Sequence, residues 1–130
     1  MLWVSYCTRK GGYRFRLIER ARRQRIRIFV SEYILRETIQ TLIEDLGQTP
    51  RFAGLARRAI LGIAKVVKLP LISKVAINED PDDEPIVQTA LSSKADYLVT
   101  ADKVILKLRK VQDVEVLSPV QFERLLDPDR

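Results

Sequence analysis

The chain has 130 residues, 46% of them hydrophobic, and a net charge of +6, a composition that predicts one globular domain with a real core. It has no histidine, and this absence excludes Ser-His-Asp and Cys-His catalysis, zinc sites built on histidine and histidine ribonuclease chemistry. Cys7 is its one cysteine, so an internal disulfide is excluded as well. Any enzymatic chemistry must therefore use carboxylates, hydroxyls, lysines or a hard metal ion bound by oxygen. The cysteine usage predicts a reducing cytoplasm, and no apolar run approaches the roughly 18 residues that would cross a membrane.

The first half of the chain predicts helices that alternate with short strands. Ser31 can cap a helix with a regular apolar face, and Gly47 ends that helix. The predicted elements are a strand fragment at 3–6, a helix over 13–24, a strand over 26–31, a helix over 31–47 and a helix over 50–67.

The second half continues this alternation. Its predicted elements are an extended segment at 69–77, a helix over 85–95, a buried strand over 96–100, a short helix or turn over 102–110, a strand over 114–118 and a helix over 119–126. Alternating strands and helices predict an α/β fold, a three-layer sandwich with a central parallel β-sheet flanked by helices. In such sheets, sites form at the carboxyl ends of the strands.

Charge is unevenly distributed along the chain. Residues 1–78 hold sixteen Lys/Arg against five Asp/Glu, a net of +11, whereas residues 79–130 hold seven against twelve, a net of −5. Seven arginines lie between Arg14 and Arg27. Such a segment attracts phosphate backbones, although a solvated helix face is an equally good interpretation of a basic stretch.

Acidic residues converge on the predicted sheet edge. Five carboxylates occupy the six positions from Glu79 to Glu84, and like charges this close must be screened by water or by a cation. Asp83 precedes a helix and Asp102 directly follows a strand, while Glu37 can point from its helix toward the same edge. Together they suit Mg²⁺ or Mn²⁺, which prefer oxygen ligands. Taken singly, Asp83 and Asp102 are more often helix N-caps and Glu37 a surface residue.

Two long segments carry a family resemblance. The segment "DPDDEPIVQTALSSKADYLVTADKVIL" resembles the second half of a PIN domain, in particular the toxin components of toxin–antitoxin systems, with Asp83, Ala90 and Asp102 at the family's spacing. Upstream, "IRIFVSEYILRETIQTL" resembles the family's strand and the helix whose glutamate falls on Glu37. "LSPVQFERLL" resembles its last strand and helix, so the resemblance covers nearly the whole chain.

The chain departs from the family at its start. PIN domains begin with a strand that ends in Asp-Thr-Asn, and Met1 aligns with that Asn, so a single PIN-like domain over 1–130 that is N-terminally truncated is expected. Either the true start lies upstream or this is a decayed, inactive copy. The presence of Glu37, Asp83 and Asp102 favours an upstream start. The chain as it stands is expected to bind metal weakly and to cleave little or no RNA.

The resemblance implies an Mg²⁺- or Mn²⁺-dependent endoribonuclease. Glu37, Asp83 and Asp102, with the missing Asp, would hold one or two metal ions. Thr100 would orient a ligand or a water from the second shell, unless it is only a β-branched strand residue. Asp82 and Asp80 are weaker ligand candidates that would rather add to the field that attracts the cation. The arginines that would hold the RNA backbone are Arg14, Arg16, Arg20, Arg23 and Arg27. A cognate antitoxin and a homodimer are further implications of the resemblance.

Two other interpretations compete with the nuclease. The first is a non-catalytic module that binds nucleic acid or an antitoxin, with the acidic loop merely solvated. The second is a phosphoacceptor receiver domain, which also uses paired acids, a threonine and a lysine. Its acid pair should follow the first strand, whereas Asp82 and Asp83 lie past the midpoint of the chain, so this interpretation is rejected.

Overall fold

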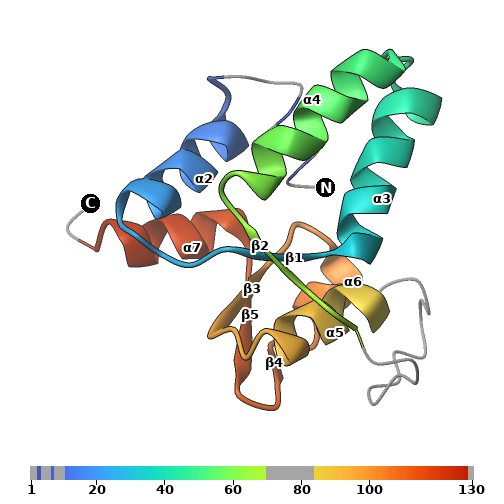
Figure 1. Cartoon of the computed structure of the whole chain (residues 1–130). Coiled ribbons are helices and arrows are strands. Elements are labelled where there is room, and N and C mark those ends of the chain that lie inside the picture. The colour runs from blue at the N-terminus through green and yellow to red at the C-terminus, as the bar shows by residue number, and fades with distance from the viewer. Residues whose placement is uncertain (1–2, 4–6, 8–10, 70–83, 129–130) are drawn as a thin grey trace. The chain divides into compact units, whose positions relative to one another are not determined.

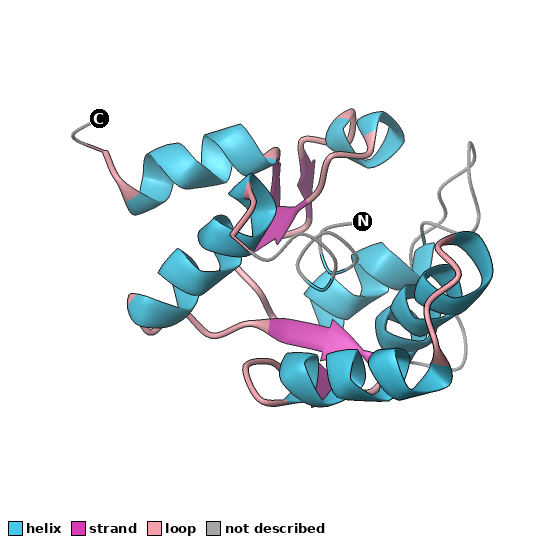
Figure 2. Ribbon diagram, turned by 90° about the horizontal axis from the view of Figure 1, so that it is seen from above, coloured by secondary structure: helices cyan, strands magenta, loops and turns pink. Residues whose placement is uncertain are grey.

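The computed structural model describes Trp3, Cys7 and residues 11–69 and 84–128. Its internal contacts divide the chain into two compact units, Met1–Val66 and Val67–Arg130. Helices and strands are mixed in both units (Figures 1 and 2), so the predicted α/β class is confirmed. Apart from Leu69, the predicted extended segment 69–77 lies outside the described residues.

The first unit is mainly helical. Lys65 donates its backbone N–H to the Ile28 carbonyl at 2.8 Å, next to a two-stranded sheet of β1 and β2. The elements in chain order are α2 (Tyr13–Arg23), β1 (Phe29–Ser31), α3 (Glu32–Gln40), the π-helix η1 (Thr41–Asp45), α4 (Pro50–Leu61) and β2 (Lys65–Val67).

Local signals explain how α3 and α4 begin and why the chain turns between them. The Ser31 hydroxyl accepts a hydrogen bond from the Ile34 N–H at 3.3 Å, and the Thr49 hydroxyl accepts one from the Phe52 N–H at 3.1 Å. Both are N-caps of the kind that polar side chains favour. Gly47 adopts a φ of +65°, which a residue without a Cβ reaches at little cost. The chain thus turns sharply, and α3 and α4 pack against each other (Figure 1).

Of the predicted strand at 3–6 the structure describes only Trp3, and residues 4–6 lie outside the described residues. Trp3 is helical and only 9% exposed, and it belongs to the buried cluster with Ile18, Val30, Leu35 and Ile60. An aromatic residue such as Trp3 favours a strand locally, but tertiary burial overrides such propensities. Burial of Trp3 among residues distant in sequence is not visible in the local pattern.

The predicted helix over 50–67 is too long. α4 ends at Leu61 with Gly62 as its C-cap, and Lys65–Val67 form β2 instead. Glycine costs a helix about 1 kcal/mol relative to alanine, and the two valines of β2 favour an extended backbone. The predicted helix over 31–47 is present, but its last turn is the π-helix η1.

The described residues of the second unit form a three-stranded sheet and three helices. Strand order is β3-β5-β4, in which β3 runs parallel to β5 with Leu98 beside Val116, and β4 runs antiparallel to β5. The elements are α5 (Glu84–Ser92), β3 (Tyr97–Val99), α6 (Lys103–Leu106), β4 (Lys110–Val111), β5 (Val114–Leu117) and α7 (Pro119–Leu126).

Strand β4 and the exposure of β3 differ from the prediction. Val111 and Val114 pair across a two-residue turn in which Gln112 has a φ of +53°. Such turns usually carry Asn-Gly or Asp-Gly, so no residue pair here predicted a hairpin. β3 was expected to be buried, yet Tyr97 is 41% exposed. The core of this unit is built around Val87, Ile105 and Val116.

Candidate functional site

Glu37 lies on α3 in the first unit. It is half-buried, and its sequence neighbours Leu35 and Thr38 are fully buried. Within the described part of the chain, its carboxylate forms no ion pair or hydrogen bond. Among the described residues, therefore, nothing occupies either oxygen of this carboxylate, and each oxygen can accept from a donor or bind a cation.

Asp102 lies in the second unit, directly after β3. It is exposed, and its Oδ1 accepts a hydrogen bond from the Val104 N–H at 2.8 Å, which makes it the N-cap of α6. The N-cap interpretation of Asp102 is therefore confirmed. It leaves Oδ2 without a partner among the described residues, so capping and metal binding are compatible at this carboxylate.

Thr100 holds the turn that carries Asp102. Its Oγ1 accepts a hydrogen bond from the Asp102 N–H at 3.1 Å, and its own N–H donates to the Leu117 carbonyl at 2.9 Å. The first bond fixes the backbone of Asp102, and the second ties the turn to β5. Thr100 and Asp102 are thus brought together, and Thr100 acts on the backbone of Asp102 rather than standing only as a strand residue.

Asp82 and Asp83 lie outside the described residues, which resume at Glu84, the first residue of α5. Among the residues that the structure does describe, no three His, Cys, Asp or Glu side chains gather into a group that could hold a metal ion. Glu37 belongs to the first unit and Asp102 to the second. Both supply carboxylate oxygens, the donor type that Mg²⁺ and Mn²⁺ prefer, so the residues present fit such an ion chemically.

The predicted RNA-binding arginines divide into two sets. Arg16 and Arg23 are exposed and Arg20 is half-buried, and their i, i+4, i+7 spacing sets them along one face of α2. Arg27, after the helix, is exposed as well. Arg14 is half-buried, and helical spacing puts it on the side that carries the buried residues Leu17, Ile18 and Ala21.

Two further arginines, Arg22 and Arg25, lie in the same segment. Arg22 pairs with Glu19, with Nη2 3.2 Å from Oε2. Arg25 is exposed and has a φ of +61° just after α2. Its place within the run of seven arginines is the sequence feature that indicates a possible RNA contact at this residue.

Cys7 offers no alternative nucleophile. It packs against the buried cluster of the first unit, and desolvation by burial raises the pKa of its thiol to about 11. Because the thiolate is the nucleophilic form, a thiol with this pKa is almost entirely unreactive at neutral pH.

Comparisons with known proteins identify the family. None of the described helices combines the length and hydrophobicity needed to cross a membrane. The comparison with curated proteins and the comparison with solved structures each gave no match. The PIN domain family matches residues 2–104, a stretch that includes Glu37, Asp83, Thr100 and Asp102. The chain belongs to the PIN domain family, whose members are in general nucleases that act on nucleic acid and use divalent metal ions.

Proposed function

We propose that this protein is an Mg²⁺- or Mn²⁺-dependent endoribonuclease of the toxin type, which cleaves RNA phosphodiester bonds in the cytoplasm. The observation that carries the proposal is the family match over residues 2–104, which spans all three candidate carboxylates. A cognate antitoxin protein and a homodimer are part of the same proposal, since they follow from the resemblance to toxin components.

In this proposal Glu37, Asp83 and Asp102 hold the divalent ion. A bound ion of this kind lowers the pKa of a water molecule and offsets negative charge on the phosphate and the leaving oxygen. Thr100 contributes by fixing the backbone of Asp102 through its 3.1 Å hydrogen bond. Asp82, next to Asp83, adds negative potential that favours a cation.

The arginines on one face of α2 supply the RNA-binding part of the proposal. Arg16, Arg20 and Arg23 form a line along the helix, and Arg27 follows it. Guanidinium groups bind phosphate oxygens in a planar, bidentate geometry. We leave Arg14 out of the phosphate contacts because it is half-buried on the opposite side of α2.

The deciding experiment separates helix capping from metal binding at Asp102. Asparagine caps a helix about as well as aspartate, so Asp102→Asn should change the free energy of unfolding in EDTA by less than about 0.5 kcal/mol. Asp102→Ala loses the cap and should cost about 1 kcal/mol. In Mn²⁺ at ten times its Kd the native protein should gain about 1.4 kcal/mol, and both variants should lose most of that gain.

Asp113→Asn is the matched control, because Asp113 is exposed in the β4–β5 turn and the change in charge is the same. It should keep the full Mn²⁺ stabilisation. Glu37→Gln and Asp83→Asn should lose it, and whatever weak cleavage of single-stranded RNA the native protein shows in Mn²⁺ should be abolished in these two variants. If Mn²⁺ stabilises every variant as much as the native protein, and neither the native protein nor any variant cleaves RNA, the protein is a non-catalytic binding module.

A further inference from the structure

Tyr13 is an aromatic residue at the start of α2, the helix that holds the arginines of the proposed RNA contacts. It is 40% exposed. A single exposed apolar residue needs no explanation by itself, because such residues are common on protein surfaces. What distinguishes Tyr13 is its position relative to the arginines.

Helical spacing puts Tyr13 beside the line of arginines. Tyr13, Arg16 and Arg20 stand at i, i+3 and i+7, so they lie on one side of α2. At the rise of an α-helix, Arg16 lies about 4.5 Å and Arg20 about 10 Å further along the helix axis than Tyr13. A nucleotide whose base rests on the Tyr13 ring therefore has guanidinium groups within reach of its backbone.

The charge of α2 favours a polyanion on this side. Glu19 is the only acidic residue of the helix. Its side chain is 17% exposed, and its Oε2 lies 3.2 Å from Nη2 of Arg22. This ion pair offsets the one negative charge on α2 that could repel a phosphate from the line of arginines.

We propose that Tyr13 stacks on an unpaired base of the RNA that the α2 arginines bind. Proteins bind single-stranded nucleic acid with this combination, in which aromatic rings stack on bases and cations bind the backbone. In a duplex the bases are paired and stacked on one another, so their faces are closed to the ring. Tyr13 thus makes the α2 surface selective for RNA that is single-stranded where it meets the helix.

The inference rests on the RNA-binding part of the proposed function and adds to it. The arginines alone bind any phosphate backbone, paired or unpaired, because their contacts are with phosphate oxygens. The ring supplies the contact that tells unpaired RNA from duplex.

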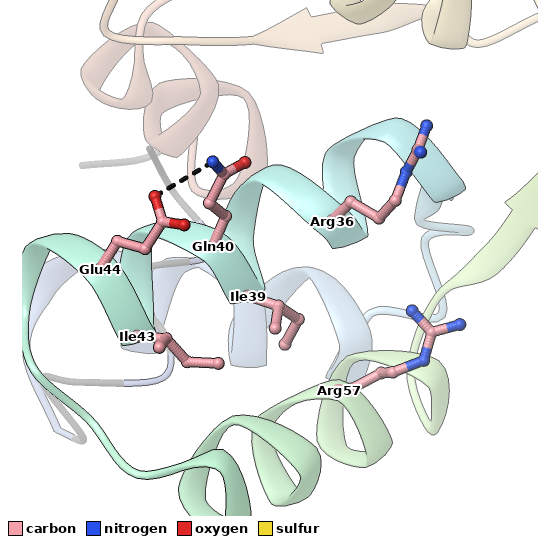
Figure 3. A pocket seen from close by; sticks show the side chains of 6 residues that line it. All are labelled: Arg36, Ile39, Gln40, Ile43, Glu44 and Arg57. Carbon is pink, nitrogen blue, oxygen red and sulfur yellow. Dashed lines mark hydrogen bonds between the residues drawn. The ribbon is translucent and has the colours of Figure 1, made fainter.

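An open groove of about 370 Å³ in the first unit is a poorer site for a base (Figure 3). It lies between α4 and the continuous helix formed by α3 and η1, and it has no aromatic residue in its lining. The carboxylate of Glu44, which accepts a hydrogen bond from Gln40 at 3.1 Å, opposes a phosphate there. The groove is lined by Arg36, Ile39, Gln40, Ile43, Glu44 and Arg57.

The exposed ring of Tyr97 in the second unit lacks the cations that accompany Tyr13. Tyr97 is 41% exposed on β3, and its register partner on β5 is Glu115. Paired residues of parallel strands face the same side of a sheet, so a carboxylate accompanies this ring. Tyr97 therefore serves as the matched control, an equally exposed ring without an arginine line.

Fluorescence anisotropy on the full-length protein in EDTA tests the inference with a single-stranded RNA of about 12 nucleotides and a duplex of the same sequence. Tyr13→Leu keeps an apolar side chain but removes the ring, so it should weaken binding of the single strand about fivefold or more. Tyr13→Gln, a second variant without a ring, should show the same loss. Tyr13→Phe keeps the ring and should bind like the native protein.

Two further readouts separate stacking from charge. Binding of the duplex should be the same in the native protein and in Tyr13→Leu. The slope of log K against log salt should also be unchanged in Tyr13→Leu, because stacking releases no counterions. Tyr97→Leu should bind both RNAs like the native protein, and circular dichroism should show every variant folded.

Three results overturn the inference and leave the RNA-binding role of the arginines standing. They are single-strand binding by Tyr13→Leu equal to that of the native protein, an equal loss in Tyr13→Phe, and an equal loss of duplex binding in Tyr13→Leu. A native protein that binds neither RNA would instead overturn the RNA-binding role of α2 and this inference with it.

Discussion

At the scale of single residues, the reactivity of the Cys7 thiol measures how well the first unit excludes solvent from its interior. Burial raises the pKa of its thiol from 9.0 to about 11, so the thiolate fraction near neutral pH is about 100-fold lower than in the unfolded chain. We predict that a maleimide alkylates Cys7 about 100-fold more slowly in the folded protein than in guanidinium chloride. Equal rates in the two states would mean that the thiol is open to solvent.

The same thiol predicts how stability depends on pH. Below pH 9 the thiol is protonated in both states and contributes no slope. As pH rises from 9 to 11 the unfolded chain loses this proton first, so the free energy of unfolding should fall. Urea denaturation across this range should show the decline in the native protein and a shallower one in Cys7→Ala. The same slope in both proteins would exclude Cys7 as its source.

Thr100 offers a second prediction at residue scale. Thr100→Val keeps the shape of the side chain but removes the acceptor for the Asp102 N–H, so it should reduce the free energy of unfolding by about 0.5–1.5 kcal/mol. Thr100→Ser keeps the acceptor and should lose less. Chemical denaturation measures both. Equal losses in the two variants would show that the methyl group matters and the hydrogen bond does not.

At the scale of helices, two glycines should respond in opposite ways to the same substitution. Gly47, after η1, has a φ of +65°, where a Cβ costs about 1–2 kcal/mol, so Gly47→Ala should destabilise the protein by about that amount. Gly54, inside α4, has open space where an alanine Cβ would lie, so Gly54→Ala should stabilise it by about 0.5–1 kcal/mol. Thermal denaturation of both variants tests the pair, and shifts of the same sign would contradict it.

The helices that the sequence predicted well are those whose ends carry local signals. α7 has the predicted bounds of 119–126, and its start is a capping box between Ser118 and Gln121. β2 and β4 were not predicted because each forms only by pairing with another strand. The β-propensity of a few consecutive residues does not show which strand they pair with. The π-helical turn at Thr41–Asp45 likewise had no signal in the apolar spacing.

The candidate site was predictable in part. The alternation of elements correctly put Asp102 after a strand and Glu37 on the helix that Ser31 caps. The hydrogen bond from the Asp102 N–H to Thr100 depends on the conformation of one turn, which the sequence does not specify. The groove beside Ile39 and Ile43 depends on how α3 and α4 pack, so it could not be found before the helices were placed.

At the scale of the whole molecule, the uneven charge links the two parts of the nuclease proposal. The net of +11 over residues 1–78 favours a phosphate backbone, while the net of −5 over residues 79–130 favours a cation. A uniformly basic chain would bind RNA but repel the metal ion. We propose that this separation lets one small protein attract both.

The salt dependence of RNA binding tests whether α2 contributes through its position or only through its charge. If Arg16 and Arg23 each neutralise a phosphate, replacing both with Ala should reduce the slope of log K against log salt by about 1.4 for single-stranded RNA. Arg51→Ala with Arg58→Ala changes the net charge equally, at exposed positions on α4, and should leave the slope nearly unchanged. Equal reductions in the two double variants, measured by anisotropy in EDTA, would assign the binding to overall charge rather than to α2.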